Sequence, residues 1–199
     1  MDNINQSLEK WLNELNNFSF KEYENLPDLD LYMEQVINYL ERQLMIFRTS
    51  TLDKQITSSM INNYVKGEVL QAPISKKYNK AHIAAIEEIC TLKQVLSIAE
   101  VKEIMDSEYN NEVEKSDAFN AFNKLNNEKI SIAVEEAFKN LNKIDENDTN
   151  GLIHLGLEFA LTANAYINIS KRILYLIRAY QAIENNKKKK KDSEEKENK

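Results

Sequence analysis

Two adjacent asparagines, Asn62 and Asn63, lie in a short polar segment whose side chains can recognise another molecule through hydrogen bonds. The asparagine amide offers an acceptor and donors that pair with adenine in the major groove of DNA. Ser58 and Ser59 lie one helical turn earlier, where hydroxyl groups near a helix N-terminus suit phosphate oxygens. These residues indicate contact with bases and phosphates. Capping of a helix end is the alternative role for the asparagines.

Lysines accompany this polar segment. Residues 53–80 carry five lysines against two acidic residues, net +3, whereas the whole chain has a net charge of −6. Lys66, Lys76 and Lys77 are candidates to bind the phosphate backbone, and the acidic remainder of the chain would repel DNA elsewhere. The alternative is that these lysines only keep a surface loop solvated.

A short helix over residues 57–66 is predicted to carry the asparagines. Its N-terminus suits Thr57 and the two serines, and its apolar positions include Ile61 and Tyr64. Gly67 is predicted to end the helix in a left-handed conformation. An irregular loop follows, in which Tyr78 joins the candidate DNA-binding residues and is expected mainly to pack as the base of a wing.

The scarcity of helix breakers, with three Gly and two Pro, favours an all-α fold. Apolar spacing predicts helices over 4–15 and 28–47, one capped by Asn79, and one capped by Ser97 that ends at Met105. Two long helices follow, forming a hairpin or bundle: 118–144, faltering at 126–127, and 152–183, after a break at 145–151.

Four regions are therefore expected along the chain. They are an N-terminal helix and connector (1–27), a winged helix-turn-helix module (28–108), a helical dimerisation or sensing region (111–186) and a disordered Lys-rich tail (187–199). The five consecutive lysines of the tail would either add affinity for DNA or form a solvated end without a specific role.

The last predicted helix repeats apolar residues at spacings of three and four over more than four heptads, which is typical of a seam between helices. A second apolar stripe lies beside the first, so we expect a homodimer; an intramolecular bundle is the alternative. The seam residues include Leu155, Phe159, Tyr166, Ile169, Ile173, Leu176 and Tyr180.

Two family resemblances involve the same segments. Residues 60–64, 76–78 and 96–105 resemble, in order, the recognition helix, wing and closing helix of MerR-type winged-helix regulators, although Asn62 stands where those regulators usually place an arginine. A closer resemblance, through 29–36, 59–66 and 76–78, is to the bacterial domain-of-unknown-function family 1836. It covers roughly residues 20–110 and implies an α-helical, DNA-binding protein.

Catalytic and metal-binding patterns are missing from the sequence. His82 and His154 stand 72 residues apart and outside any metal-ligand spacing, and the single Cys90 lies in an apolar helical run, as a buried thiol would. Phosphate-loop and nucleophile-elbow motifs do not occur. We expect no enzyme activity, no metal and no cofactor.

The N-terminal residues are polar and carry no secretion signal, and the apolar runs are too short for a membrane span, which predicts a cytoplasmic protein. The expected function is transcription regulation by a homodimer on a palindromic operator in double-stranded DNA, with any small-molecule effector unknown. The alternative is a non-enzymatic helical adaptor that binds other proteins, which the acidic total and the missing arginine favour.

Overall fold

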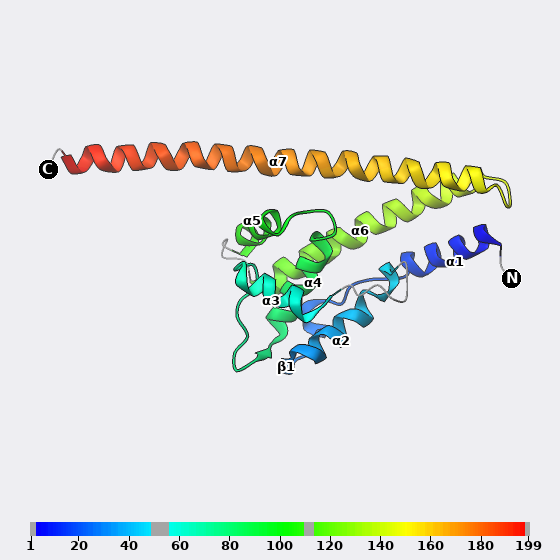
Figure 1. Ribbon diagram of the computed structural model, residues 1–199, viewed down its shortest axis with the longest axis horizontal. Coiled ribbons are helices and arrows are strands. Elements are labelled where there is room, and N and C mark those ends of the chain that lie inside the picture. The colour runs from blue at the N-terminus through cyan, green and yellow to red at the C-terminus, as the bar shows by residue number, and fades with distance from the viewer. Residues whose placement is uncertain (1–2, 49–55, 110–113, 198–199) are drawn as a thin grey trace. The chain divides into compact units, whose positions relative to one another are not determined.

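Helices make up most of the protein, as predicted (Figure 1). A computed structural model describes residues 3–48, 56–109 and 114–197. The α-helices are α1 (Ile4–Asn16), α2 (Met33–Gln43), α3 (Ser58–Lys66), α4 (Lys80–Leu92), α5 (Ile98–Tyr109), α6 (Lys115–Leu141) and α7 (Thr149–Glu197). Short 3-10 helices η1 (Tyr23–Asn25) and η2 (Met45–Phe47) and strands β1 (Leu31–Tyr32) and β2 (Lys77–Tyr78) complete the fold.

The chain divides into two compact units, which we describe separately. Unit 1, Met1–Gly156, contains every element from α1 to α6 and the first turns of α7. Unit 2, Leu157–Lys199, is the continuation of α7.

Local hydrogen bonds start three of the helices where the sequence predicted. The side chain of Thr57 accepts from the Met60 amide at 3.2 Å, and that of Asn79 accepts from the His82 amide at 3.1 Å. The hydroxyl of Ser97 accepts from the amide three residues later at 3.3 Å. Because each cap needs only residues within one turn, a sequence pattern is enough to locate it.

Helix α2 starts later than predicted. Instead of beginning at Asp28, it begins at Met33, because Leu31 and Tyr32 form β1. This strand pairs antiparallel with β2, placing Leu31 opposite Tyr78 and Tyr32 opposite Lys77. The partner strand lies more than forty residues away in the chain, so a local pattern could not reveal it.

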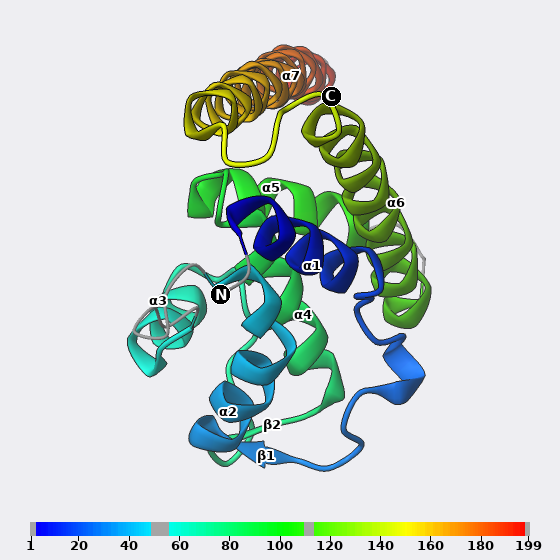
Figure 2. The same cartoon turned by 90° about the vertical axis from the view of Figure 1, so that its right-hand side faces the viewer.

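The core of unit 1 forms around α4, whose Ile83, Ile86 and Ile89 are completely buried. In Figure 2, α4 lies at the centre of this unit, with α2 and α6 on different sides of it. The neighbouring helices each contribute buried apolar residues, which include Val36, Leu40, Ile61, Val101, Phe119 and Val134.

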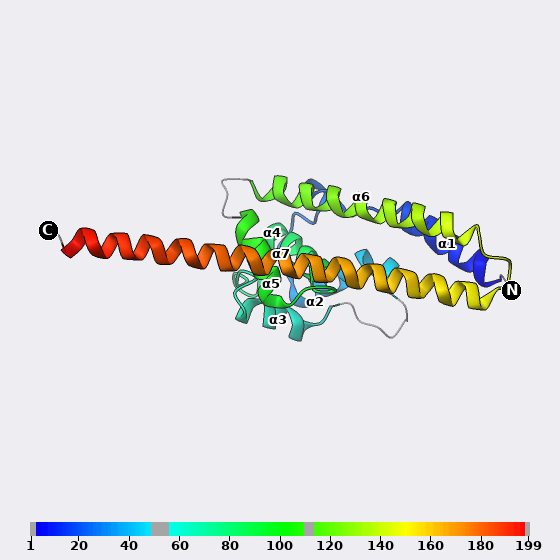
Figure 3. The ribbon, with the colours of Figure 1, turned by 90° about the horizontal axis from the view of Figure 1, so that it is seen from above.

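Helix α6 belongs to unit 1, whereas the sequence placed a domain boundary between residues 108 and 111. It packs along α1, and the two helices run side by side in Figure 3. Asn120 accepts from the backbone amide of Tyr23 at 2.8 Å, and Asn123 donates to the carbonyl of Lys21 at 3.0 Å. The helix runs without a break through 126–127, where the sequence indicated a weak point, because tertiary packing outweighs the low helix propensity of asparagine.

Helix α7 is longer than predicted at both ends. It starts at Thr149, inside the expected break, and continues to Glu197, although the composition of 187–199 predicted disorder. Lysine and glutamate are good helix formers, and extending an existing helix is easier than starting one, which accounts for the extension.

Candidate nucleic-acid interface

Helix α3 has one buried face and one exposed face. Ile61 and Tyr64 are buried in unit 1, at 0% and 4% exposure, and burial raises the pKa of the Tyr64 hydroxyl. The predicted site residues Ser58, Ser59, Asn62, Asn63 and Lys66 are all exposed. The two buried anchors therefore set which side of the helix faces outward.

The asparagine side chains of α3 are available for an external partner. Within the described ranges, neither Asn62 nor Asn63 uses its side-chain amide in a hydrogen bond. The end of the helix is closed by backbone groups instead, since the Gly67 amide donates to the Asn63 carbonyl at 2.9 Å. The alternative that these side chains cap the helix therefore has no support in the geometry.

The left-handed residue after α3 is Glu68, with φ of 56°, and not Gly67, whose φ is −79°. The amides of Val69 and Leu70 both donate to the Tyr64 carbonyl, at 3.0 and 3.2 Å. The left-handed residue that ends the helix is therefore one position later than the sequence predicted. A Cβ at Gly67 would lie 3.2 Å from the Asn63 carbonyl oxygen. Glycine is suited to this position by close approach rather than by a left-handed backbone.

The loop after α3 ends in a tight hairpin. Ile74 and Lys77 exchange two backbone hydrogen bonds, at 3.1 and 2.9 Å, around Ser75 and Lys76. These two central residues have φ values of 51° and 65°, as in the primed turns that join twisted antiparallel strands. Lys76 is exposed at the tip of this hairpin.

Tyr78 is the base of the hairpin and is not part of an exposed surface. It is 3% exposed, its ring meets that of His82 edge-on at 5.6 Å between centroids, and burial raises the pKa of its hydroxyl. Its inclusion among the DNA-contacting residues is corrected on this ground. The interpretation of Tyr78 as a packed base agrees with the structure.

The lysines of the basic segment differ in exposure and in whether they contact another described residue. Lys77 is partly buried, with its ammonium 5.5 Å from the centre of the Tyr32 ring. Lys80 forms an ion pair with Asp28 at 3.5 Å and donates to the Glu24 carbonyl at 3.3 Å. Lys54 lies outside the described residues. Of the remaining lysines in the segment, Lys66 and Lys76 are exposed and have no ion pair with a described residue.

The sequence did not indicate that two carboxyl groups lie in the core. Glu87 and Glu88 on α4 are 1% and 2% exposed. Burial, with a contribution from the charge of Glu88, raises the pKa of Glu87 to about 8. Glu87 follows the buried Ile83 by four residues and therefore lies on the apolar face of the helix. This spacing is the sequence feature from which the burial of Glu87 could have been predicted.

Metal binding finds no support within the described parts of the chain, where no group of His, Cys, Asp and Glu side chains is arranged to hold an ion. His82 is buried and its ring nitrogens approach the Asn79 side chain at 2.6 Å and the Ala72 carbonyl at 3.4 Å, while His154 is exposed. Cys90 is buried, as predicted, and burial raises its pKa to about 12. No helix in the described segments has the length and apolar character needed to cross a membrane.

Fold and site together define a predominantly helical protein that presents a polar helix face beside a short hairpin. Residues 21–140 match the family described as Domain of unknown function (DUF1836), and the chain belongs to this family. The match confirms the resemblance to this domain-of-unknown-function family, and it includes nearly all of α6. Comparisons with curated proteins and with solved structures found no match.

Proposed function

We propose that this protein is a DNA-binding transcriptional regulator in which α2, α3 and the 74–78 hairpin form a winged helix-turn-helix. The observation that carries the proposal is the face of α3, where five hydrogen-bonding side chains are exposed above two buried anchors. A helix of this kind can enter the major groove without loss of its own packing.

The arrangement around α3 supports this role. Helix α2 contacts both α3 and β2, so one element holds the candidate recognition helix and the base of the candidate wing. The order helix, connection, helix, hairpin resembles that of MerR-type regulators. In this arrangement Asn62 and Asn63 read base edges, Ser58 and Ser59 approach phosphates, and Lys66 with the wing lysines contacts the backbone.

Selection of bound sequences from random double-stranded DNA, followed by Asn62→Ala and Asn63→Ala, tests the proposal. Each substitution should relax the preference at particular base positions and cost roughly 1–3 kcal/mol of binding free energy per lost bidentate contact. Asn16→Ala, at an exposed position of α1, is the matched control and should bind like the unmodified protein. Failure to enrich any sequence, or an equal loss on all sequences, contradicts base reading by these residues.

We further propose that two copies associate through α7. Its predicted seam remains exposed in unit 2, where Tyr166 is 69%, Ile169 57% and Tyr180 64% exposed. An apolar stripe of this length is rarely left in water, and its heptad spacing suits a second copy of the same helix. Leu155, in unit 1, is instead buried, and Phe159 is partly buried, so the proposed seam runs mainly from Tyr166 onward.

The adaptor alternative draws on a specific observation. Lys80 is held by Asp28, and Lys77 lies over the Tyr32 ring, which interrupts the positive surface that phosphate binding requires. Affinity that does not change between low and high salt would favour a protein partner over DNA, since phosphate contacts release counterions and fade as salt rises.

A further inference from the structure

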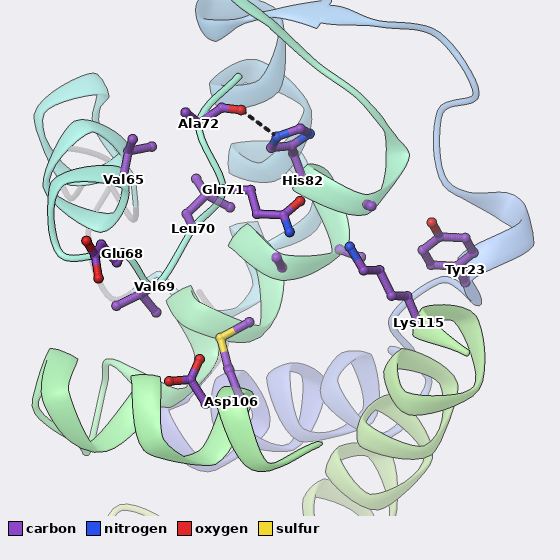
Figure 4. A pocket seen from close by; sticks show the side chains of 14 residues that line it. Tyr23, Val65, Glu68, Val69, Leu70, Gln71, Ala72, His82, Asp106 and Lys115 are labelled. Atoms are coloured by element: carbon purple, nitrogen blue, oxygen red, sulfur yellow. Dashed lines mark hydrogen bonds between the residues drawn. The ribbon is translucent and has the colours of Figure 1, made fainter. Parts of the chain in front are cut away.

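A cavity of about 550 Å³ opens in unit 1 beside the segment that follows α3 (Figure 4). Its walls come from residues 65–72, from α4, from the C-terminal part of α5 and from the start of α6, with Tyr23 of η1 at the edge. A volume of this size is within the range of small-molecule sites. Part of the space exists because three of the four residues that α4 contributes to the lining are alanines, Ala81, Ala84 and Ala85, and the fourth is His82.

The two ends of the cavity differ chemically. In Figure 4, Val65 and Val69 line one end, while Tyr23 and Lys115 stand at the other, with Gln71 between them. Leu70 and Met105 add further apolar surface. The cavity can therefore hold a molecule with an apolar body and a polar group at one end.

The charges differ between the two ends of the cavity, and only the Lys115 end favours a negative group. The exposed carboxylate of Glu68 lies at the opposite end, beside Val65 and Val69. Asp106 is paired with Lys102 at 3.4 Å, and that lysine also donates to the Glu68 carbonyl at 2.7 Å. Lys115 has no ion-pair partner among the residues that the structure describes. His82 stays neutral near physiological pH because burial lowers its pKa, so Lys115 supplies the unpaired cation at this end.

We propose that this cavity binds a small organic carboxylate with an apolar body. Its carboxylate pairs with the ammonium of Lys115 and accepts from the amide of Gln71, and its body lies against Val69, Leu70 and Met105. Residues 67–72 connect α3 to the hairpin and form one wall of the cavity. A bound ligand would therefore also affect the positions of α3 and the hairpin, the two elements of the candidate interface. That regulatory consequence rests on the proposed function, whereas binding itself does not.

Calorimetric titration of the full chain with 2-naphthoate tests the proposal without any DNA. The acid should bind measurably, and (2-naphthyl)methylammonium, which has a similar body and the opposite charge, should bind at least about tenfold more weakly. Equal binding of the two probes, or no binding of 2-naphthoate, would overturn the proposal.

Lys115→Glu locates the binding site. It should weaken 2-naphthoate binding by about tenfold, because repulsion replaces a charge-assisted contact. The variant should remain folded, since a negative charge suits the first turn of α6. Lys124→Glu, exposed on the same helix outside the cavity, is the matched control and should leave binding unchanged. If the apolar face of α7 bound the probe instead, Lys115→Glu would have no effect, which also overturns the assignment.

A second variant tests whether the probe occupies the cavity. Ala85→Leu places a larger side chain in the cavity at a partly buried position and should reduce binding of 2-naphthoate while leaving thermal unfolding cooperative. Binding that is equally strong in this variant and in the unmodified protein would place the ligand elsewhere.

Discussion

Unit 1 buries carboxyl groups in its core, whereas unit 2 exposes large apolar side chains on its surface. Glu87 is 1% exposed, while Ile173 and Leu176 are 53% and 51% exposed. Both arrangements are unfavourable when taken alone, because ionised carboxylates prefer water and apolar side chains avoid it. Unit 1 offsets the cost of its buried carboxyl groups by burying many apolar residues, and the raised pKa of Glu87 favours its uncharged form. Unit 2 is one helix, and its exposed apolar stripe is the observation behind the proposal that two copies associate.

The largest effect is expected from a charge placed in the exposed stripe. Ile173→Asp should convert a dimer into a monomer at micromolar concentration, because a twofold interface would bury the new charge on both copies. Tight binding to a palindromic operator should disappear as well. Sedimentation analysis measures the first effect and a binding titration the second.

Asn164→Asp, at an exposed polar position of α7, serves as the control and should remain dimeric. If the unmodified protein sediments as a monomer, the exposed apolar stripe of unit 2 is not an interface between copies.

A smaller but substantial effect is expected from the buried carboxyl of unit 1. The pKa of Glu87 is raised from 4.5 to about 8, so the folded state holds its proton more tightly than the unfolded state does. The associated stability is fully present below pH 4.5 and is lost as pH rises through about 8. Each unit of pKa difference corresponds to about 1.4 kcal/mol of unfolding free energy.

Glu87→Gln should remove this dependence and make the protein more stable near pH 8 than the unmodified chain. Denaturant unfolding at a series of pH values measures the effect. Glu136→Gln, at an exposed position of α6, should keep the original profile. A profile that is unchanged in Glu87→Gln would show that the core of unit 1 does not hold a proton at this residue.

The smallest effect concerns which unit contacts phosphate. Lys66→Ala and Lys76→Ala should each reduce the slope of log affinity against log salt by about one and weaken binding to all DNA sequences alike. Lys171→Ala, on the exposed surface of unit 2, should leave the slope unchanged. A smaller salt slope in Lys171→Ala would mean that unit 2 also contacts phosphate, which contradicts the assignment of these contacts to unit 1.

The sequence by itself determined the helical class and several helix starts. Thr57, Asn79 and Ser97 act through hydrogen bonds to residues within one turn, so their neighbours in the chain are sufficient to predict them. The apolar positions of α3 followed from helical spacing for the same local reason, and among them Ile61 and Tyr64 are buried.

Only the tertiary structure decided what the distant residues do. Pairing with β2 turned Leu31 and Tyr32 into a strand, and packing on α1 placed α6 in the same unit as α4. The ion pair with Asp28 took Lys80 out of the basic surface that its segment predicted. These contacts join residues far apart in the chain, and because their energies depend on the complete packing, a local pattern of residues does not contain them.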